Sequence, residues 1–271
     1  METGVKHTEY GLSVEKIEAA LQADGAPSVP VFLYGEVSST SDLARAYAEE
    51  GGGTAVFIAE SQTAGRGRRG RSFSSPAGSG VYMSLLVFPT HGASEGVLLT
   101  TGAAVAACRA VERVSGLRPE IKWVNDLKLG GKKLCGILTE GQIEPESGRF
   151  AYAVIGVGIN IKEVPREVSD IATALQLHTK KAIDRNLLAA YMIGEILKSL
   201  SENRALQMAE YRRLCPVVGK AVAVTRGEEH FAARVLAIEE DGSLRLLCEG
   251  EEMRLSSGEI SIRDIKETED R

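Results

Sequence analysis

The sequence predicts an α+β fold, in which a sheet with flanking helices precedes a small C-terminal β-barrel of SH3-like size. Between residues 31 and 214, β-rich runs alternate with helical patterns, as is typical of a sheet packed against helices. After Pro216 only short β-rich runs follow, and about fifty residues of short strands suit a small barrel. The composition, with 44% hydrophobic and 25% charged residues, is that of an ordinary globular protein.

Caps, breakers and hydrophobic periodicity define the individual elements. Ser13 can cap a first helix in which Val14, Ile17, Ala20 and Leu21 share one face. We expect a short N-terminal helical extension over residues 1–30, a main domain over 31–214 and a C-terminal domain over 215–271. The main-domain strands are expected over 31–34, 54–59, 81–88, 121–123, 126–129, 133–139 and 150–161, and its helices over 39–50, 93–115, 184–200 and 203–214. The C-terminal strands are expected over 221–225, 231–238, 244–248 and 252–255.

Charge and cysteine content exclude several classes of protein. The chain has 32 Lys and Arg against 37 Asp and Glu, a net charge of −5, which disfavours a protein that coats nucleic acid or an anionic membrane. Its four cysteines lie too far apart for CxxC pairs or zinc knuckles. The first thirty residues show no signal-peptide pattern, so we expect a cytoplasmic protein with cysteines that serve mainly as small core residues.

The sequence GRGRRGR over residues 65–71 is the sharpest anomaly in this acidic chain. Arginine offers a fork of donors that fits phosphate or carboxylate, and glycine permits positive φ and close backbone approach. A solvated basic loop or a nucleic-acid patch would explain the arginines. The interleaved glycines favour a mobile anion-binding loop, because solvation alone needs no such backbone freedom.

Two further stretches carry candidate binding residues. The sequence KWVND at 122–126 is followed by Lys133 after a Gly130-Gly131 turn. These lysines could simply point to water from an edge hairpin, and Trp123 could be plain core. At residues 154–161, Gly156 and Gly158 interrupt a strand, which indicates close approach by a ligand or another backbone. The stretch is no dinucleotide fingerprint, and the chain has no Walker motif.

The order and spacing of five motifs resemble the biotin protein ligase family. They are SST at 38–40, ESQTAGRGRRG at 60–70, KWVND at 122–126, KLCGIL at 133–138 and GVGIN at 156–160. The resemblance covers about residues 31–265. It implies a class II synthetase-like catalytic domain with a mixed sheet and an SH3-like C-terminal domain. The thirty N-terminal residues are too few for a helix-turn-helix domain, so we expect the monofunctional type that lacks a DNA-binding domain.

The resemblance also implies an activity. Members of the family use ATP and Mg²⁺ to activate biotin as biotinyl-5′-AMP, and then join biotin to a lysine of a biotin carboxyl carrier protein. The four histidines lie outside all the motifs, in keeping with a reaction that needs no protein nucleophile. A lipoate or octanoate protein ligase is the nearest enzyme alternative, and a nucleic-acid-binding regulator is an alternative of another class. The protein could be a monomer or a homodimer.

The family pattern implies roles for individual residues of this chain. Lys133, Arg66, Arg68 and Lys122 would be catalytic, and Asp126 would hold magnesium. ATP would be bound by Arg68, Arg69, Trp123, Asn125, Asp126, Lys133 and Asn160. Biotin would be bound by Ser39, Thr40, Ser41, Gln62, Gly65, Arg66, Gly67, Arg68, Lys133, Gly136, Gly156 and Gly158. Two positions depart from the pattern, since the family often has Asn at Ser41 and Pro at Val124.

Overall fold

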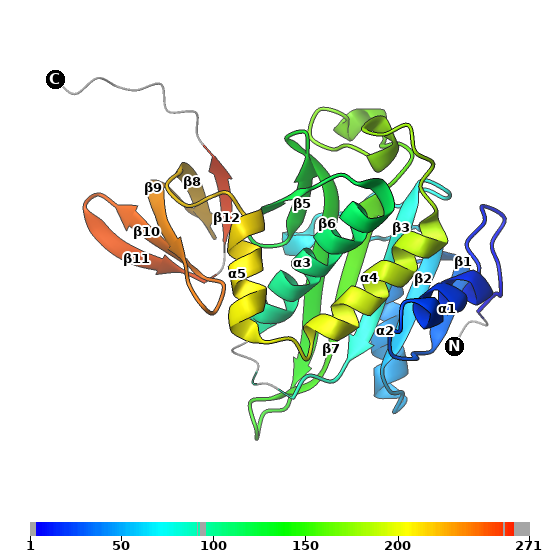
Figure 1. Ribbon diagram of the computed structural model, residues 1–271. Helices are drawn as coiled ribbons and strands as arrows, with labels where there is room; N and C mark the ends of the chain where they lie inside the picture. Colours follow the sequence, from blue (N-terminus) through cyan, green and yellow to red (C-terminus); the bar gives the residue numbers. More distant parts are fainter. Residues whose placement is uncertain (1–3, 91, 93–95, 257, 263–271) are drawn as a thin grey trace.

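A seven-stranded sheet forms the centre of the molecule (Figure 1), and the computed structural model describes residues 4–90, 92, 96–256 and 258–262. The strand order is β1-β2-β3-β7-β6-β5-β4. β1 pairs with β2 in parallel and all other neighbours pair antiparallel, so the predicted mixed sheet is confirmed. The strands are β1 (Val31–Val37), β2 (Ala55–Gln62), β3 (Gly80–Val87), β4 (Glu120–Lys122), β5 (Asp126–Leu129), β6 (Lys132–Ile143) and β7 (Phe150–Asn160).

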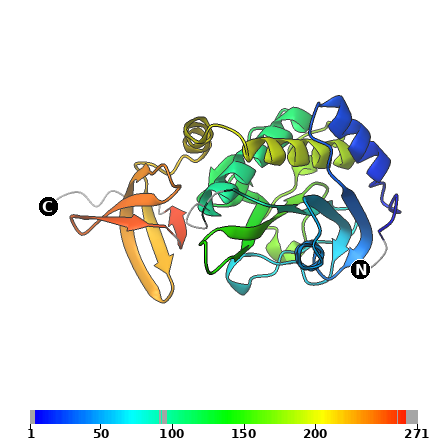
Figure 2. The same ribbon diagram turned by 90° about the horizontal axis from the view of Figure 1, so that it is seen from below.

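Helices cover both faces of this sheet (Figure 2). Alternate side chains of β2 point to opposite faces: Val56 and Ile58 join the larger apolar core, while Phe57 and Ala59 join a smaller one beneath α2. Because both faces are buried, β2 is apolar from Ala55 to Ala59 and β3 is apolar over most of its length. The helices are α1 (Val14–Ala23), α3 (Gly96–Ser115) and α4 (Arg185–Ser199) on one face, and α2 (Thr40–Glu49) on the other.

Side-chain caps begin three of the helices, including the predicted cap at Ser13, whereas Ser39 at the start of α2 makes no side-chain cap hydrogen bond. Ser13 accepts a hydrogen bond from the backbone N–H of Lys16, and Asp184 and Asn203 cap α4 and α5 (Arg204–Leu214) in the same way. The expected helix over 93–115 is α3, which the structure describes from Gly96; residues 93–95 lie outside the described residues.

The C-terminal region is a five-stranded antiparallel sheet in the order β11-β10-β9-β8-β12. Its bounds are β8 (Ala221–Arg226), β9 (Glu229–Ile238), β10 (Leu244–Cys248), β11 (Glu251–Leu255) and β12 (Glu259–Ile262). β12 was absent from the sequence prediction, and residues 263–271 of the predicted domain lie outside the described residues. α5 leads into this C-terminal sheet.

Hydrogen bonds connect the main sheet, α5 and the C-terminal sheet to one another. The Trp123 indole N–H donates to the carbonyl oxygen of Gly242 at 2.9 Å, which places this buried tryptophan on the seam between the two sheets. The Tyr211 hydroxyl of α5 donates to the carbonyl of Val124 at 3.0 Å, and Arg212 Nε donates to the carbonyl of Ile238 at 2.8 Å. The C-terminal sheet therefore lies beside the turn from the edge strand β4 to its neighbour β5.

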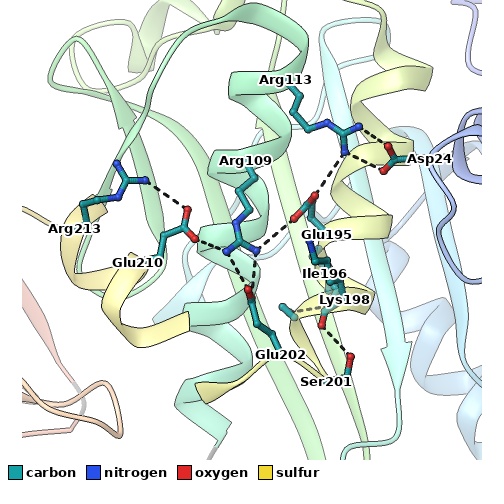
Figure 3. Close-up of polar contacts among 11 residues, drawn as sticks. Asp24, Arg109, Arg113, Glu195, Ile196, Lys198, Ser201, Glu202, Glu210 and Arg213 are labelled. Carbon is teal, nitrogen blue, oxygen red and sulfur yellow. Dashed lines mark hydrogen bonds and ion pairs between the residues drawn. The ribbon is translucent and has the colours of Figure 1, made fainter. Parts of the chain in front are cut away.

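An ionic network holds three helices together on the outer face of the molecule (Figure 3). Arg109 of α3 contacts Glu195 of α4, Glu202 in the following turn and Glu210 of α5. Arg113, one turn along α3, pairs with Asp24 just after α1 and lies over the Tyr191 ring. This network joins every helix on that face.

The cysteines lie mainly in the core, as predicted. Cys108, Cys135 and Cys215 are buried, and Cys248 is half-buried. Burial raises the pKa of the Cys108 and Cys215 thiols to about 12, so both stay protonated at neutral pH. No helix in the described part of the chain is long and apolar enough to cross a membrane.

Candidate active site

A cavity of about 120 Å³ opens on the α2 face of the main sheet. Its walls come from the start of α2, the loop after β2, the strands β3 to β7 and the C-terminal sheet. Nearly all the residues predicted to bind a ligand line this cavity. They are Ser39, Thr40, Ser41, Gln62, Arg66, Gly67, Arg68, Lys122, Trp123, Asn125, Asp126, Lys133, Gly136, Gly156 and Gly158.

Glycines form the floor of the cavity. Gly136 of β6 lies directly opposite Gly158 of β7, and Gly156 lies two residues along, facing Ser84 of β3. A Cβ on Gly158 would come within 2.5 Å of the Phe73 ring, and one on Gly156 within 3.1 Å of the Ser41 hydroxyl. The absent side chains therefore create the space, as the two glycines in the predicted strand indicated.

A cluster of hydroxyl and amide groups lies at one end of the floor. The Ser84 hydroxyl is 2.7 Å from the Thr40 hydroxyl and 2.9 Å from the Ser41 hydroxyl. Gln62 Oε1 accepts a hydrogen bond from the Thr40 backbone N–H at 2.9 Å, and Gln62 Nε2 donates to the Ser75 hydroxyl at 3.0 Å. This end of the cavity is neutral and rich in donors and acceptors.

Residues 65–71, the arginine loop, form the tip of a narrow ribbon. Gly65 accepts a backbone hydrogen bond from Phe73 at 2.8 Å, and a Cβ on Gly65 would lie 2.4 Å from the Phe73 carbonyl oxygen. Gly65 therefore lets the two arms approach and does not line the cavity. Arg69 is exposed at the tip, with positive φ, and its Nη2 is 3.5 Å from the carbonyl of Thr225, outside the cavity.

The cationic end of the cavity centres on Lys133. Its Nζ is 2.8 Å from Asp126 Oδ1. The backbone of Lys133 is held on both sides, because its N–H donates to Ile171 and its carbonyl accepts from Thr173, each at 2.8 Å. Asn160 does not line the cavity; its Nδ2 donates to the carbonyl of Thr173 at 3.1 Å and thereby supports the segment that holds Lys133.

The KWVND stretch forms the turn from β4 to β5. Lys122 lies directly opposite Asp126 in this hairpin, and the Trp123–Val124 peptide bond is cis. Asn125 Nδ2 donates to the carbonyl of Ile137 at 2.6 Å, and its Oδ1 accepts from Arg68 Nη1 at 3.0 Å. Asn125 thus connects the arginine loop to β6.

Several cavity residues were absent from the sequence prediction. Phe73 covers the glycine floor, and Lys133 Nζ lies 6.0 Å from the centre of its ring. Ser84 is fully buried. The sequence feature that could have identified it is a lone serine within the apolar run of β3. Gly258 and Ile260 reach the cavity from the C-terminal sheet, and the Gly258 carbonyl lies 3.4 Å from Arg68 Nη2.

The acidic side chains near the cavity do not form a complete metal site. No group of three or more His, Cys, Asp or Glu side chains in the described part of the chain could hold a metal ion by itself. Asp126 is the carboxylate that lines the cavity. Magnesium commonly takes one or two protein carboxylates together with substrate phosphates, so this donor set suits Mg²⁺ that arrives with a nucleotide.

Comparison with known proteins agrees with this geometry. Residues 37–160 match the biotin/lipoate A/B protein ligase family, and residues 217–263 match the biotin protein ligase C-terminal domain. A biotin–[acetyl-CoA-carboxylase] ligase of Mycobacterium tuberculosis is 31% identical over 216 residues, which cover 76% of this chain and 77% of that protein. The chain belongs to the biotin protein ligase family.

Two further comparisons extend this result. The bifunctional ligase/repressor BirA of Bacillus subtilis is 41% identical over 162 residues, or 56% of this chain, and the match spans about half of that relative's length (48%). The Aquifex aeolicus biotin protein ligase in complex with biotin and ATP superposes with a TM-score of 0.69 at 26% identity, covering 86% of this chain and 98% of that one. The predicted α+β fold and family are confirmed.

Proposed function

We propose that this protein is an ATP-dependent biotin protein ligase, which forms biotinyl-5′-AMP and then transfers biotin to one lysine of a biotin carboxyl carrier protein. One observation carries the proposal: a single cavity joins a neutral cluster of hydroxyl and amide groups to a cationic end at Lys133. Biotin has the matching polarity, with a neutral ureido ring at one end and a carboxylate at the other.

Activation would proceed by attack of the biotin carboxylate on the α-phosphorus of ATP, with pyrophosphate as the leaving group. Because like charges meet, the protein must position the reactants and stabilise developing negative charge. Lys133 and Arg68 both line the cavity and can supply that field. Lys133 would exchange its present partner, Asp126, for the carboxylate and phosphate oxygens.

Magnesium would be held by Asp126 together with the nucleotide phosphates. When bound, it would neutralise phosphate charge and polarise the phosphoryl oxygens. Asp126→Ala should therefore raise the Mg²⁺ concentration needed for half-maximal activity several-fold. A magnesium titration of pyrophosphate exchange measures this, and an unchanged curve would assign Asp126 to holding Lys133 alone.

Transfer would follow while the mixed anhydride is still enclosed. The amine of the carrier lysine attacks the acyl carbonyl, an amide bond forms, and AMP leaves with the bonding electrons. The anhydride hydrolyses readily in water, so the arginine loop and Phe73 would serve to exclude solvent. The cavity volume of about 120 Å³ is small compared with typical ligand sites of about 300–1,000 Å³. Ligand binding would therefore displace one or both of them.

The test is mass spectrometry of a biotin carboxyl carrier domain after incubation with the protein, biotin and Mg-ATP. A gain of one biotin on one lysine is expected, and a carrier of unchanged mass would refute the proposal. Lipoate in place of biotin tests the alternative ligase, which the shared family description makes the relevant competitor. A gel-shift assay at low salt tests the expectation that the protein has no specific DNA binding.

A further inference from the structure

Arg66 is held by carboxylates from two different elements. Its Nη1 is 2.8 Å from Asp42 Oδ1, in the first turn of α2, and its Nη2 is 3.0 Å from Glu140 Oε2, on β6. Asp42 also pairs with Arg45, one turn along α2. The Arg66 side chain is therefore fixed between the helix and the sheet that together border the cavity.

Within the described part of the chain, one nitrogen of Arg66 has no partner. Its Nε–H is buried, and no hydrogen-bond partner for it exists among the described residues. A buried donor without a partner is energetically costly, so such groups are rare in folded proteins. Arg66 also lines the cavity, and a ligand oxygen would satisfy this donor.

We propose that Asp42 and Glu140 are positioning residues, which fix the plane of the Arg66 guanidinium so that its Nε–H donates to an oxygen of the acyl-adenylate. This inference rests on the proposed function. A guanidinium is planar, so anchoring both terminal nitrogens determines the direction of the Nε–H bond.

The carboxylates also change what Arg66 can contribute. Two anionic partners offset its positive charge, so Arg66 acts on the substrate mainly as an oriented hydrogen-bond donor. Lys133, with the single partner Asp126, keeps a movable charge for the phosphate. The two cationic groups would thus have separate tasks in one cavity.

The experiment uses the isosteric variants Asp42→Asn and Glu140→Gln, which remove charge and keep the shape of each side chain. Selective ¹⁵N-arginine NMR of the free protein reports rotation about the Arg66 Cζ–Nε bond. We expect separate Nη signals in the wild type and averaged signals in each variant, because each variant weakens one anchor.

Kinetics of biotin-dependent pyrophosphate exchange test the consequence. We expect kcat to fall about tenfold in each variant through misorientation of the donor, with the KM for biotin within about twofold. In an Arg66→Ala background the same two substitutions should change nothing further, since they act through Arg66. Additive losses in that background, or averaged Nη signals in the wild type, would overturn the proposal.

A matched control lies on the C-terminal sheet. Arg245 is also held by two carboxylates, Glu239 at 3.0 Å and Glu252 at 3.4 Å, and these three residues are not among those that line the cavity. Glu252→Gln should leave pyrophosphate exchange unchanged. A tenfold fall there would mean that the assay responds to any broken ion pair, and it would remove the kinetic support for the proposed role of Asp42 and Glu140. Absence of biotin-dependent exchange in the wild type would refute the proposed function. The NMR result would still decide whether Asp42 and Glu140 fix the Arg66 guanidinium.

Discussion

Arg109 and Arg66 are both enclosed by carboxylates, yet only one of them lies at a cavity. Arg109 contacts Glu195 of α4, Glu202 in the turn after α4 and Glu210 of α5 (Figure 3), and its Nη groups are both used. Arg66 contacts Asp42 and Glu140, and its buried Nε–H remains available. The comparison shows that ion pairing alone does not distinguish an arginine with a structural role from one that binds a ligand. A buried donor without a partner, beside a cavity, distinguishes the two.

The largest effect should come from Lys133→Ala in the cavity. Loss of a charge-assisted contact that forms mainly in the transition state should cost roughly 3 kcal/mol or more, or over about 100-fold in adenylate formation. Pyrophosphate exchange measures this loss, and circular dichroism should show an intact fold. Near-wild-type exchange by the variant would remove Lys133 from the reaction.

Arg109→Met should lower stability and leave activity nearly unchanged, which is the opposite of the effect expected for Lys133→Ala. Removal of the guanidinium leaves three carboxylates close together, so the free energy of unfolding should fall by about 2 kcal/mol, a figure reduced for partial exposure. Urea denaturation measures this change. Pyrophosphate exchange per folded molecule should stay within about twofold of wild type, and a selective loss of exchange would show that the helical network reaches the cavity.

Arg68→Gly should mainly impair retention of the adenylate. Arg68 contacts Asn125 and the Gly258 carbonyl, so its loss removes two of the contacts that hold the arginine loop at the cavity. We expect release of reactive adenylate about tenfold faster than in wild type, seen as biotin on bystander lysines.

Trypsin offers a second measurement of the same loop. Arg69 and Arg71 are exposed, so wild-type protein should be cut there without ligands and protected by biotin with Mg-ATP. Equal cutting rates with and without ligands would mean that the loop does not close over the site.

The smallest expected effect concerns acid stability. The hydrogen bond from Arg109 lowers the pKa of Glu210 below its ordinary 4.5. This carboxylate therefore contributes stability above about pH 4.5, which is lost as the pH falls through the lower folded-state value. Between pH 5 and 3, wild type should lose about 0.5 kcal/mol more than Glu210→Gln in urea titrations, because solvent screens the pair. Parallel curves would show that the pair adds no stability.

Local sequence signals predicted most of the fold. Ser13, Asp184 and the Gly130-Gly131 turn define element ends through chemistry within a few residues, and the structure has the elements there. β12 escaped prediction because Glu259–Ile262 is too short for a periodic pattern, and its pairing with β8 is a contact between distant residues.

The site residues that escaped prediction also owe their position to contacts between distant parts of the chain. Phe73 reaches the glycine floor only because the arginine loop folds back as a ribbon, and Asp42 and Glu140 meet Arg66 only across α2 and β6. Asn160 was predicted to bind ATP from its motif, but in this structure it holds the Thr173 carbonyl. A motif identifies which residues matter more readily than what each one contacts.

The placement of Trp123 gives the molecule a built-in optical probe. It is the only tryptophan in the chain, it lines the cavity, and its indole N–H is bonded to Gly242 of the C-terminal sheet. Light emitted on selective indole excitation therefore originates at the seam between the two sheets. The wavelength of this fluorescence depends on how much water reaches the indole. Filling of the cavity and separation of the sheets can therefore each be followed in real time without a label.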